Sequence, residues 1–203
     1  MHAVFPLKVT PTMFIRLFAA AAFATQLTAC VPVVVGGAAA GGAMAADRRT
    51  SGTYIEDQGI EIKGEKAIIE QIAEKIHANV TSFNRNVLIT GEAFNQESKD
   101  KATAIVKNID NVRSVTNEVI IAGKSTLTGR SNDTYITSKV KARMLSENRF
   151  PANYVKVVTE NSTVYLMGLV THQEADDATE IARGTEGVEK VVKVFEYMDD
   201  AAK

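Results

Sequence analysis

The sequence predicts an α+β protein made of two tandem units, each with the element order αββαβ. The first observation is an internal repeat, because Asn86-Val87-Leu88-Ile89-Thr90-Gly91 has a counterpart in Thr163-Val164-Tyr165-Leu166-Met167-Gly168. The second is that both units change between helical and β periodicity in the same order. The third is the small size of each sheet. A three-stranded sheet has one apolar face that must be covered, and two amphipathic helices can cover it. We therefore expect two three-stranded sheets, each covered by two helices.

The spacing of apolar residues assigns the elements of both units. Recurrence every three or four residues indicates a helix, and short runs rich in β-branched residues indicate strands. In the first unit the elements are a helix through Ile68, Ile72 and Ile76, strands at 80–83 and 87–90 around Asn84-Arg85, a second helix at 102–109 and a last strand at 115–121. In the second unit they are a helix through Ile136, Val140 and Met144, strands at 155–159 and 164–167 around Asn161-Ser162, a second helix at 175–182 and a last strand at 191–198.

Four further residues occupy special backbone positions. Gly91 and Gly168 end the second predicted strand of each unit, where a residue without Cβ relieves crowding. Asn111 and Gly187 follow the second helix and tolerate a positive φ, which fits a left-handed helix cap. A ligand-binding loop is the alternative for the glycines, but neither lies near a phosphate-loop pattern.

The N-terminal segment, residues 1–29, has the layout of a secretory signal peptide. Basic residues precede an apolar stretch at 17–24, and small residues follow it. The apolar stretch is too short to span a bilayer, because a transmembrane helix needs about 20 apolar residues. Translation from Met1 and translation from Met13 would give the same mature protein.

Cys30 is the only cysteine and ends the run Leu27-Thr28-Ala29-Cys30. This run resembles the lipobox of bacterial lipoproteins, which implies a diacylated thiol at Cys30 and cleavage of the signal before it. An ordinary signal peptide with an incidental Cys30 is the alternative, but a leftover thiol in an exported protein needs an explanation, and lipidation supplies one. Because Val31 follows the cysteine, in place of an Asp that retains lipoproteins in the inner membrane, we expect delivery to the outer membrane.

Residues 30–53 are expected to form a lipid-anchored flexible linker. The part from 31 to 46 is uncharged and is interrupted by Gly pairs, and it is short for a second membrane span. The polar stretch at 47–52 closes the linker. The two αββαβ units are then assigned to residues 54–123 and 131–199.

Composition excludes several classes of function. With 45% hydrophobic residues, 23% charged residues and a net charge of −1, the chain is neither disordered nor strongly basic, so nucleic acid is not an expected partner. The histidines are His2, His77 and His172, and no His-x-x-x-His or Cys-x-x-Cys spacing exists. We therefore expect no catalytic residue, no metal site and no cofactor, and a protein that is not an enzyme.

Charge separates the first helices of the two units. Residues 63–77 carry three Lys and three Glu, whereas residues 133–149 carry four basic and two acidic residues, a net charge of +2. If the apolar positions of the second stretch face the sheet, its outer face presents aromatic, basic and aliphatic side chains together. Such a face suits an anionic bilayer. The alternative is an ordinary solvated helix with Tyr135 half-buried.

Several of these features together resemble one family, the dual BON-domain outer-membrane lipoproteins of the DolP (YraP) type. They are the paired αββαβ units, the glycine after each second strand, the Val-x-x-Val pattern before each last strand, and the run Asn132-Asp133-Thr134-Tyr135-Ile136-Thr137-Ser138-Lys139-Val140. The first unit departs most, because Asn111-Val112 stands where the family has Gly-Val. Its first helix also differs from the Asn-Asp-Thr run of the second unit, so properties of the family that depend on this helix are better placed in the second unit.

The resemblance implies binding of anionic phospholipid through the first helix of the second domain. The implied residues are Tyr135, Lys139, Lys141, Arg143 and Leu145. It further implies a periplasm-facing, lipid-anchored protein of the outer membrane that supports envelope integrity. The alternative is an adaptor that binds envelope proteins in outer-membrane assembly or cell-wall remodelling. A large apolar patch on the uncovered sheet faces would favour the adaptor, and exposure of Tyr135 and Leu145 would favour lipid binding.

Overall fold

The computed structural model describes residues 47–123 and 127–198. The predicted signal peptide, Cys30 and the predicted linker up to Ala46 lie outside the described residues. All described residues belong to one compact unit.

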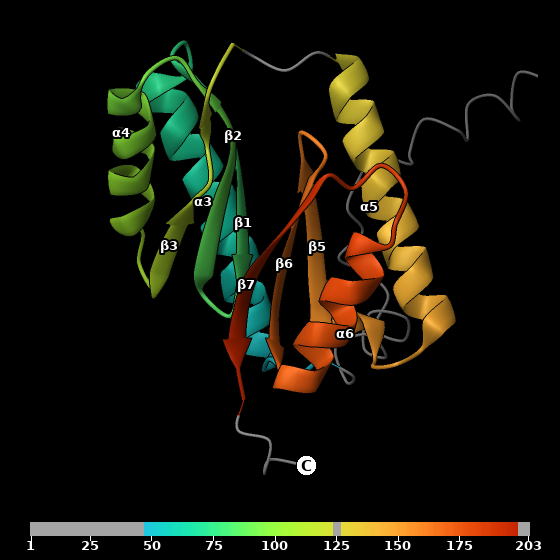
Figure 1. Ribbon diagram of the computed structural model, residues 1–203. Helices are drawn as coiled ribbons and strands as arrows, with labels where there is room; N and C mark the ends of the chain where they lie inside the picture. The colour runs from blue at the N-terminus through green and yellow to red at the C-terminus, as the bar shows by residue number, and fades with distance from the viewer. Residues whose placement is uncertain (1–46, 124–126, 199–203) are drawn as a thin grey trace, which may run out of the picture. The chain divides into compact units, whose positions relative to one another are not determined.

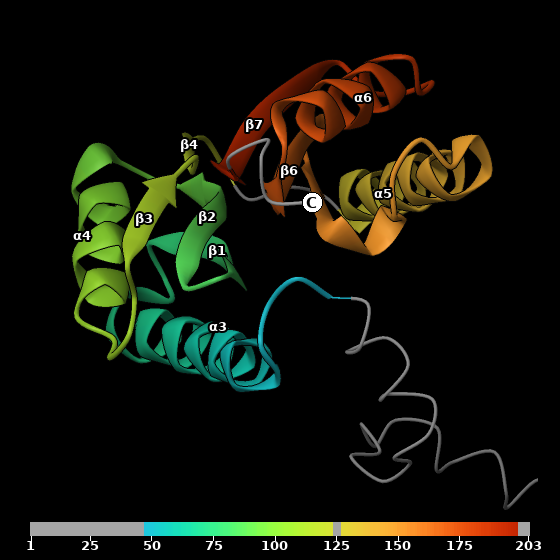
Figure 2. The same ribbon diagram turned by 90° about the horizontal axis from the view of Figure 1, so that it is seen from below.

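The first half of the described chain folds as a sheet with two helices. Its elements are α3 (Ser51–Ile72), β1 (Ile76–Phe83), β2 (Asn86–Ala93), α4 (Gln96–Lys107), β3 (Ser114–Asn117) and the short β4 (Ile120–Ile121). Strand β2 pairs antiparallel with β1 and parallel with β3 and β4. Helices α3 and α4 cover one face of this sheet (Figures 1 and 2).

The second half repeats the arrangement. Its elements are α5 (Leu127–Glu147), the 3₁₀ turn η2 (Ala152–Tyr154), β5 (Val155–Glu160), β6 (Thr163–Val170), α6 (His172–Arg183) and β7 (Lys190–Tyr197). Strand β6 pairs antiparallel with β5 and parallel with β7. Helices α5 and α6 cover one face (Figure 2). The α+β class and the repeated αββαβ order are confirmed.

Positive φ values occur in both hairpin turns and after both second helices. Each hairpin has positive φ at both central residues, 51° and 63° at Asn84-Arg85 and 48° and 58° at Asn161-Ser162. Two consecutive positive φ values define the hairpin turn whose twist matches that of the flanking strands. Asn111 and Gly187 have the expected positive φ values of 69° and 91°. They are not the helix caps, however, because α4 and α6 are capped by Asn108 and Gly184, whose φ values are −85° and −78°.

The structure corrects the start and end of the first predicted helix. Helix α3 begins at Ser51, within the stretch assigned to the linker, because the Thr50 side chain accepts a hydrogen bond from the Thr53 backbone N–H and caps the helix. Ile76 does not belong to the helix, since it opens β1.

The two strand glycines are also placed differently from the prediction. Gly91 and Gly168 lie inside β2 and β6 and do not end them. A Cβ on Gly91 would lie 2.1 Å from the carbonyl oxygen of His77, and one on Gly168 would lie 2.5 Å from that of Tyr154. These positions need glycine because the neighbouring backbone approaches closely.

Three apolar clusters stabilise the fold. One lies between the first sheet and α3 and α4, and another lies between the second sheet and α5 and α6. The third contains Phe83 and Leu88 of the first sheet together with Tyr165 and Met167 of the second. The sheet faces without helices therefore bury apolar side chains against each other.

Candidate functional site

Helix α5, the first helix of the second half, carries the predicted binding residues. Its inner face is the expected one, because Ile136, Val140 and Met144 are at most 1% exposed. The Asp133 carboxylate accepts hydrogen bonds of 2.9 Å from the backbone N–H groups of both Asn161 and Ser162. The start of α5 is thereby fixed to the β5–β6 hairpin.

The outer face of α5 exposes two large apolar side chains. Tyr135 is 62% exposed and Leu145 is 68% exposed, and Lys141 between them is also exposed. Tyr135 is therefore not a half-buried core residue. An aromatic ring, an aliphatic side chain and an ammonium group share the solvent side of one helix.

Lys139 is less available than Lys141. Its Nζ lies 4.6 Å from the centroid of the Tyr135 ring and 3.7 Å from Glu186 Oε2, and its side chain is 24% exposed. An ammonium over an aromatic face is attracted by the ring electrons. Lys139 therefore adds positive charge beside Tyr135 and orients its ring.

Arg143 binds to the protein itself. Its Nη1 donates to the Ile181 carbonyl oxygen at 3.0 Å and to Thr185 Oγ1 at 3.2 Å, and its Nη2 donates to Glu147 Oε1 at 2.7 Å. The carbonyls at the end of α6 lack partners within their helix, and a cation there also suits the helix dipole. Arg143 thus joins α5 to α6, and its contact with a lipid stays a prediction.

A second cation at the end of α5 is neutralised in a similar way. Arg149 lies 2.9 Å from Glu180, 2.9 Å from Glu147 and 3.4 Å from Asp177. The bond to Glu180 is the main cause of the raised pKa of Arg149. Arg143 and Arg149 are thus paired within the protein, so the positive charge left on the outer face of α5 is that of Lys141 and, close to Glu186, that of Lys139.

Sequence reasoning missed the residue that fixes α3. The buried carboxylate of Asp57 accepts hydrogen bonds from Ser82 Oγ at 2.6 Å, from the backbone N–H of Asn84 at 2.8 Å and from that of Arg85 at 2.7 Å. It is the counterpart of Asp133, because each Asp binds the hairpin turn of its own half. The available signal was the recurrence of an Asp some 27 or 28 residues before each turn.

The stretch before α3 is ordered by two arginines. Arg48 Nη1 and Nη2 donate to the two carboxylate oxygens of Glu174 at 2.6 and 2.8 Å, and the guanidinium lies 3.8 Å from the centroid of the Tyr154 ring. Arg49 binds Asp47 and Asp57. Burial opposes ionisation of Glu174, but hydrogen bonds from Arg48 and from the Thr171 backbone outweigh it, so the pKa of Glu174 is lowered.

Two buried glutamates were also missed. Glu92 in β2 is 2% exposed and accepts a hydrogen bond from Asn161 Nδ2, and Glu160 in β5 is 7% exposed and accepts one from Asn79 Nδ2. Burial raises the pKa of Glu160 despite the bond from Asn79, and the charge of Glu92 adds to the rise. Both residues keep a carboxyl group between the sheets.

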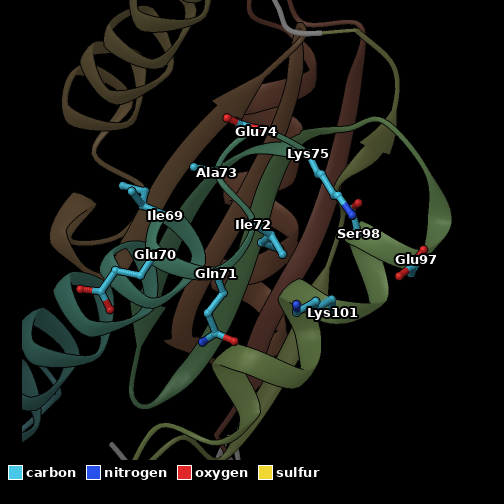
Figure 3. Close-up of a pocket in the computed structure, with 10 residues that line it drawn as sticks. All are labelled: Ile69, Glu70, Gln71, Ile72, Ala73, Glu74, Lys75, Glu97, Ser98 and Lys101. Atoms are coloured by element: carbon cyan, nitrogen blue, oxygen red, sulfur yellow. The ribbon is translucent and has the colours of Figure 1, made fainter.

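A hollow of about 420 Å³ lies where α3 ends and α4 begins (Figure 3). Its charged wall mixes Glu70, Glu74 and Glu97 with Lys75 and Lys101.

Two other kinds of site are absent from residues 47–123 and 127–198. This part of the chain holds no group of three or more His, Cys, Asp or Glu placed to ligate a metal ion. None of its helices combines the length and the apolar character that crossing a membrane requires.

Comparison with known proteins gives consistent matches over most of the chain. A family model for the BON domain matches residues 63–123 and 132–199. The chain is 40% identical over 175 residues to the outer membrane lipoprotein DolP of Haemophilus influenzae, covering 85% of this chain and 91% of that protein. It is 32% identical to the 21 kDa hemolysin of Actinobacillus pleuropneumoniae, with 75% and 79% covered. It is 28% identical to the osmotically-inducible protein Y of Escherichia coli K12, with 69% and 72% covered.

Proposed function

Because the chain belongs to the BON-domain family and is similar over most of its length to an outer membrane lipoprotein, we propose that it is a non-enzymatic lipoprotein that binds anionic phospholipid. In this proposal Cys30 carries the acyl anchor in the outer membrane, the folded part faces the periplasm, and lipid binding supports the integrity of the envelope. Val31, after the anchor residue, is compatible with delivery to the outer membrane.

The observation that carries the proposal is the outer face of α5. Tyr135 and Leu145 expose apolar surface, and Lys139 and Lys141 place positive charge beside it. Tyrosine suits the boundary between headgroups and water, because its ring is apolar and its hydroxyl is polar. Basic groups near an anionic surface each contribute about 1 kcal/mol.

The adaptor alternative predicts a large exposed apolar patch on the sheet faces that no helix covers. In the described part of the chain those faces are occupied, because Phe83, Leu88, Tyr165 and Met167 are at most 5% exposed. This arrangement supports lipid binding over an adaptor that uses the sheets.

Co-sedimentation with vesicles tests the proposal. The chain from Asp47 onward should bind vesicles that contain phosphatidylglycerol and should bind vesicles of neutral lipid weakly. Tyr135→Ala and Leu145→Ala should each reduce binding, while Phe94→Ala, at an exposed aromatic residue outside α5, serves as the matched control. Binding that ignores both the anionic lipid content and the α5 changes would refute the proposal.

Among the predicted lipid-binding residues, Arg143 can show whether its main role is to stabilise the fold or to contact lipid. Since its guanidinium bonds to α6, Arg143→Ala should lower the free energy of unfolding and should change vesicle binding less than Lys141→Ala does. The reverse pattern would show that Arg143 leaves α6 to contact the lipid. Thermal unfolding and co-sedimentation of the same two variants measure both effects.

The anchor is tested separately. Metabolic labelling with a fatty-acid probe should mark the wild-type chain and should not mark Cys30→Ala. Several acyl chains hold a protein stably where one holds it marginally, so the wild type should resist a salt wash. Recovery of the mature protein mainly with inner-membrane fractions would contradict delivery to the outer membrane.

A further inference from the structure

Helix α3 carries an exposed apolar ridge that neither its own sheet nor the proposed lipid contact uses. Ile55, Ile62 and Ile69 are 66%, 66% and 64% exposed. They recur every seven residues, which is close to two turns of an α-helix, so they lie along one line of the surface. We call these three residues the α3 ridge.

The ridge is not the side of α3 that packs on the sheet. Ile60, Ile68 and Ile72 form that side and are 2%, 2% and 6% exposed. Helix α3 is therefore apolar on two sides. A surface helix of a globular protein usually has one apolar stripe, and a second stripe marks an interaction surface.

The residues on either side of the ridge along α3, which we call its rims, carry both signs of charge. Gln58 and Glu65 lie on one rim, and Gly59 and Lys66 lie on the other. All of them except Gly59 are exposed. Because the acidic group would be repelled by an anionic bilayer, the ridge suits a protein surface of mixed charge better than a membrane.

The order of these residues along α3 matches the order along a second, antiparallel copy of the same helix. If a second α3 runs antiparallel with its Ile62 on the first Ile62, Ile55 of each copy faces Ile69 of the other. In the same register the Gln58 amide lies opposite the other copy's Glu65 carboxylate. We propose that the α3 ridge is a dimerisation surface, on which two copies of this chain pair through antiparallel α3 helices related by a two-fold axis.

The second rim supports the same register. Gly59 faces Lys66 of the other copy, and a Cβ placed on Gly59 would meet no atom within 4 Å. The absent side chain leaves room for the aliphatic part of Lys66 to lie along the helix backbone. Each close contact of the pair is thus made twice, as a two-fold axis requires.

The end of the ridge also has room for a side chain. Ile69 borders the hollow of about 420 Å³ beside α4 (Figure 3) and, on its other side, a hollow of about 310 Å³ next to Ile76. In the antiparallel register Ile55 of the second copy enters this region. Aliphatic side chains placed between hollows of this kind can interdigitate.

The surface is distinct from the proposed lipid site, which lies on α5. Two helices of this length form an interface at the small end of the usual range, so the local concentration of the chain matters. An acyl anchor confines the chains to one membrane and raises that concentration. The dimer is therefore best tested with the full-length chain in its own envelope.

Cysteine cross-linking in isolated envelopes gives a test with positional resolution. The wild-type chain has only Cys30, which sets the background. Ile62→Cys lies on the proposed axis and should form a disulfide-linked dimer on mild oxidation, and Lys107→Cys at the exposed end of α4 should not. Ile55→Cys and Ile69→Cys should link to each other when the two variants are expressed together. Each alone should link poorly, because like residues would lie about 21 Å apart along the helices.

Several outcomes would overturn the proposal. They are no Ile62→Cys dimer above background, equal linking at Lys107→Cys, strong linking of Ile55→Cys to itself, or an Ile62→Cys product with the mass of a different protein. A second variant tests the apolar contact, because Ile62→Glu should abolish the link between Ile55→Cys and Ile69→Cys. Unchanged thermal unfolding of Ile62→Glu confirms that the fold persists, as expected for a residue that is 66% exposed.

Discussion

Helices α3 and α5 occupy the same place in the two halves and share the contacts that the fold needs. Each packs three aliphatic or sulfur-containing side chains on its own sheet, and each uses an Asp to bind a hairpin turn. Their solvent sides differ, since α3 exposes three Ile among balanced charges and α5 exposes Tyr135 and Leu145 beside two Lys. The repeat therefore keeps the buried side constant and varies the exposed side, which gives one fold two chemically different exposed surfaces.

The largest effect is expected from a charge placed in either core. Ile72→Asp and Val140→Asp bury an unpaired carboxylate, which costs several kcal/mol against a total stability of about 5 to 15 kcal/mol. We expect each change to remove amide-exchange protection mainly in its own half. Equal loss of protection in both halves from either change would show that the third cluster, between the sheets, couples them into one cooperative unit.

The two hairpin-binding Asp residues should differ in importance. Asp57 accepts bonds from Ser82, Asn84 and Arg85 and pairs with Arg49, whereas Asp133 accepts from two backbone N–H groups. Removing one partner of a buried ion pair costs about 3–5 kcal/mol, and an unsatisfied buried donor costs about 1–3 kcal/mol.

Urea unfolding of Asp57→Ala and Asp133→Ala measures this difference. The loss of unfolding free energy should be larger for Asp57→Ala. A larger loss for Asp133→Ala would mean that the Arg49 pair contributes little. Asn substitutions at both positions serve as controls, because an amide oxygen can still accept part of the bonds.

The comparison also shows what the sequence could predict. Buried faces and hairpin turns depend on local periodicity and on residue type, and both were placed correctly in both halves. The left-handed caps were not, because the positive φ values lie at Asn111 and Gly187, three residues beyond the helix caps Asn108 and Gly184. The start of α3 was missed because Ile55 and Ile62 on the outer side blur its periodicity. Asp57, Glu92 and Glu160 were missed because their partners are distant in sequence, so only the folded chain brings them together.

The predicted binding residues also fall into two groups, those that local periodicity places and those whose contacts depend on the packing of the folded chain. Tyr135 and Leu145 follow from the helical period once the inner face is known. The pairing of Arg143 with the end of α6 and of Lys139 with Glu186 depends on how α5 and α6 pack. A count of charges along one helix cannot show that a neighbouring helix neutralises some of them.

The salt concentration should distinguish the ionic contacts that α5 makes with lipid from its apolar contacts. Lys139→Gln with Lys141→Gln should cost about 2 kcal/mol, or roughly thirtyfold in affinity for anionic vesicles, at low salt. The loss should shrink at 1 M salt, where screening limits the field to about 3 Å. Tyr135→Ala should weaken binding at both salt concentrations, because its contact is apolar. A Tyr135→Ala effect that vanishes at high salt would contradict interfacial burial of the ring.

The smallest effects are expected from pH, and they have opposite signs at two glutamates. The pKa of Glu174 is lowered on folding, so its contribution to stability is present above the usual pKa of a glutamate and is lost as the pH falls through its lowered value. The pKa of Glu160 is raised, so its contribution is present in acid and is lost as the pH rises through its raised value.

Glu160→Gln should therefore stabilise the protein at neutral pH, because it removes a buried charge while an amide oxygen can still accept from Asn79. Glu174→Gln should destabilise it there, because the paired charge of Arg48 remains. Thermal midpoints measured from pH 4 to pH 8 for both variants check these signs, and a fall in the neutral-pH midpoint of Glu160→Gln would show that Glu160 is held as a stabilising anion between the two sheets.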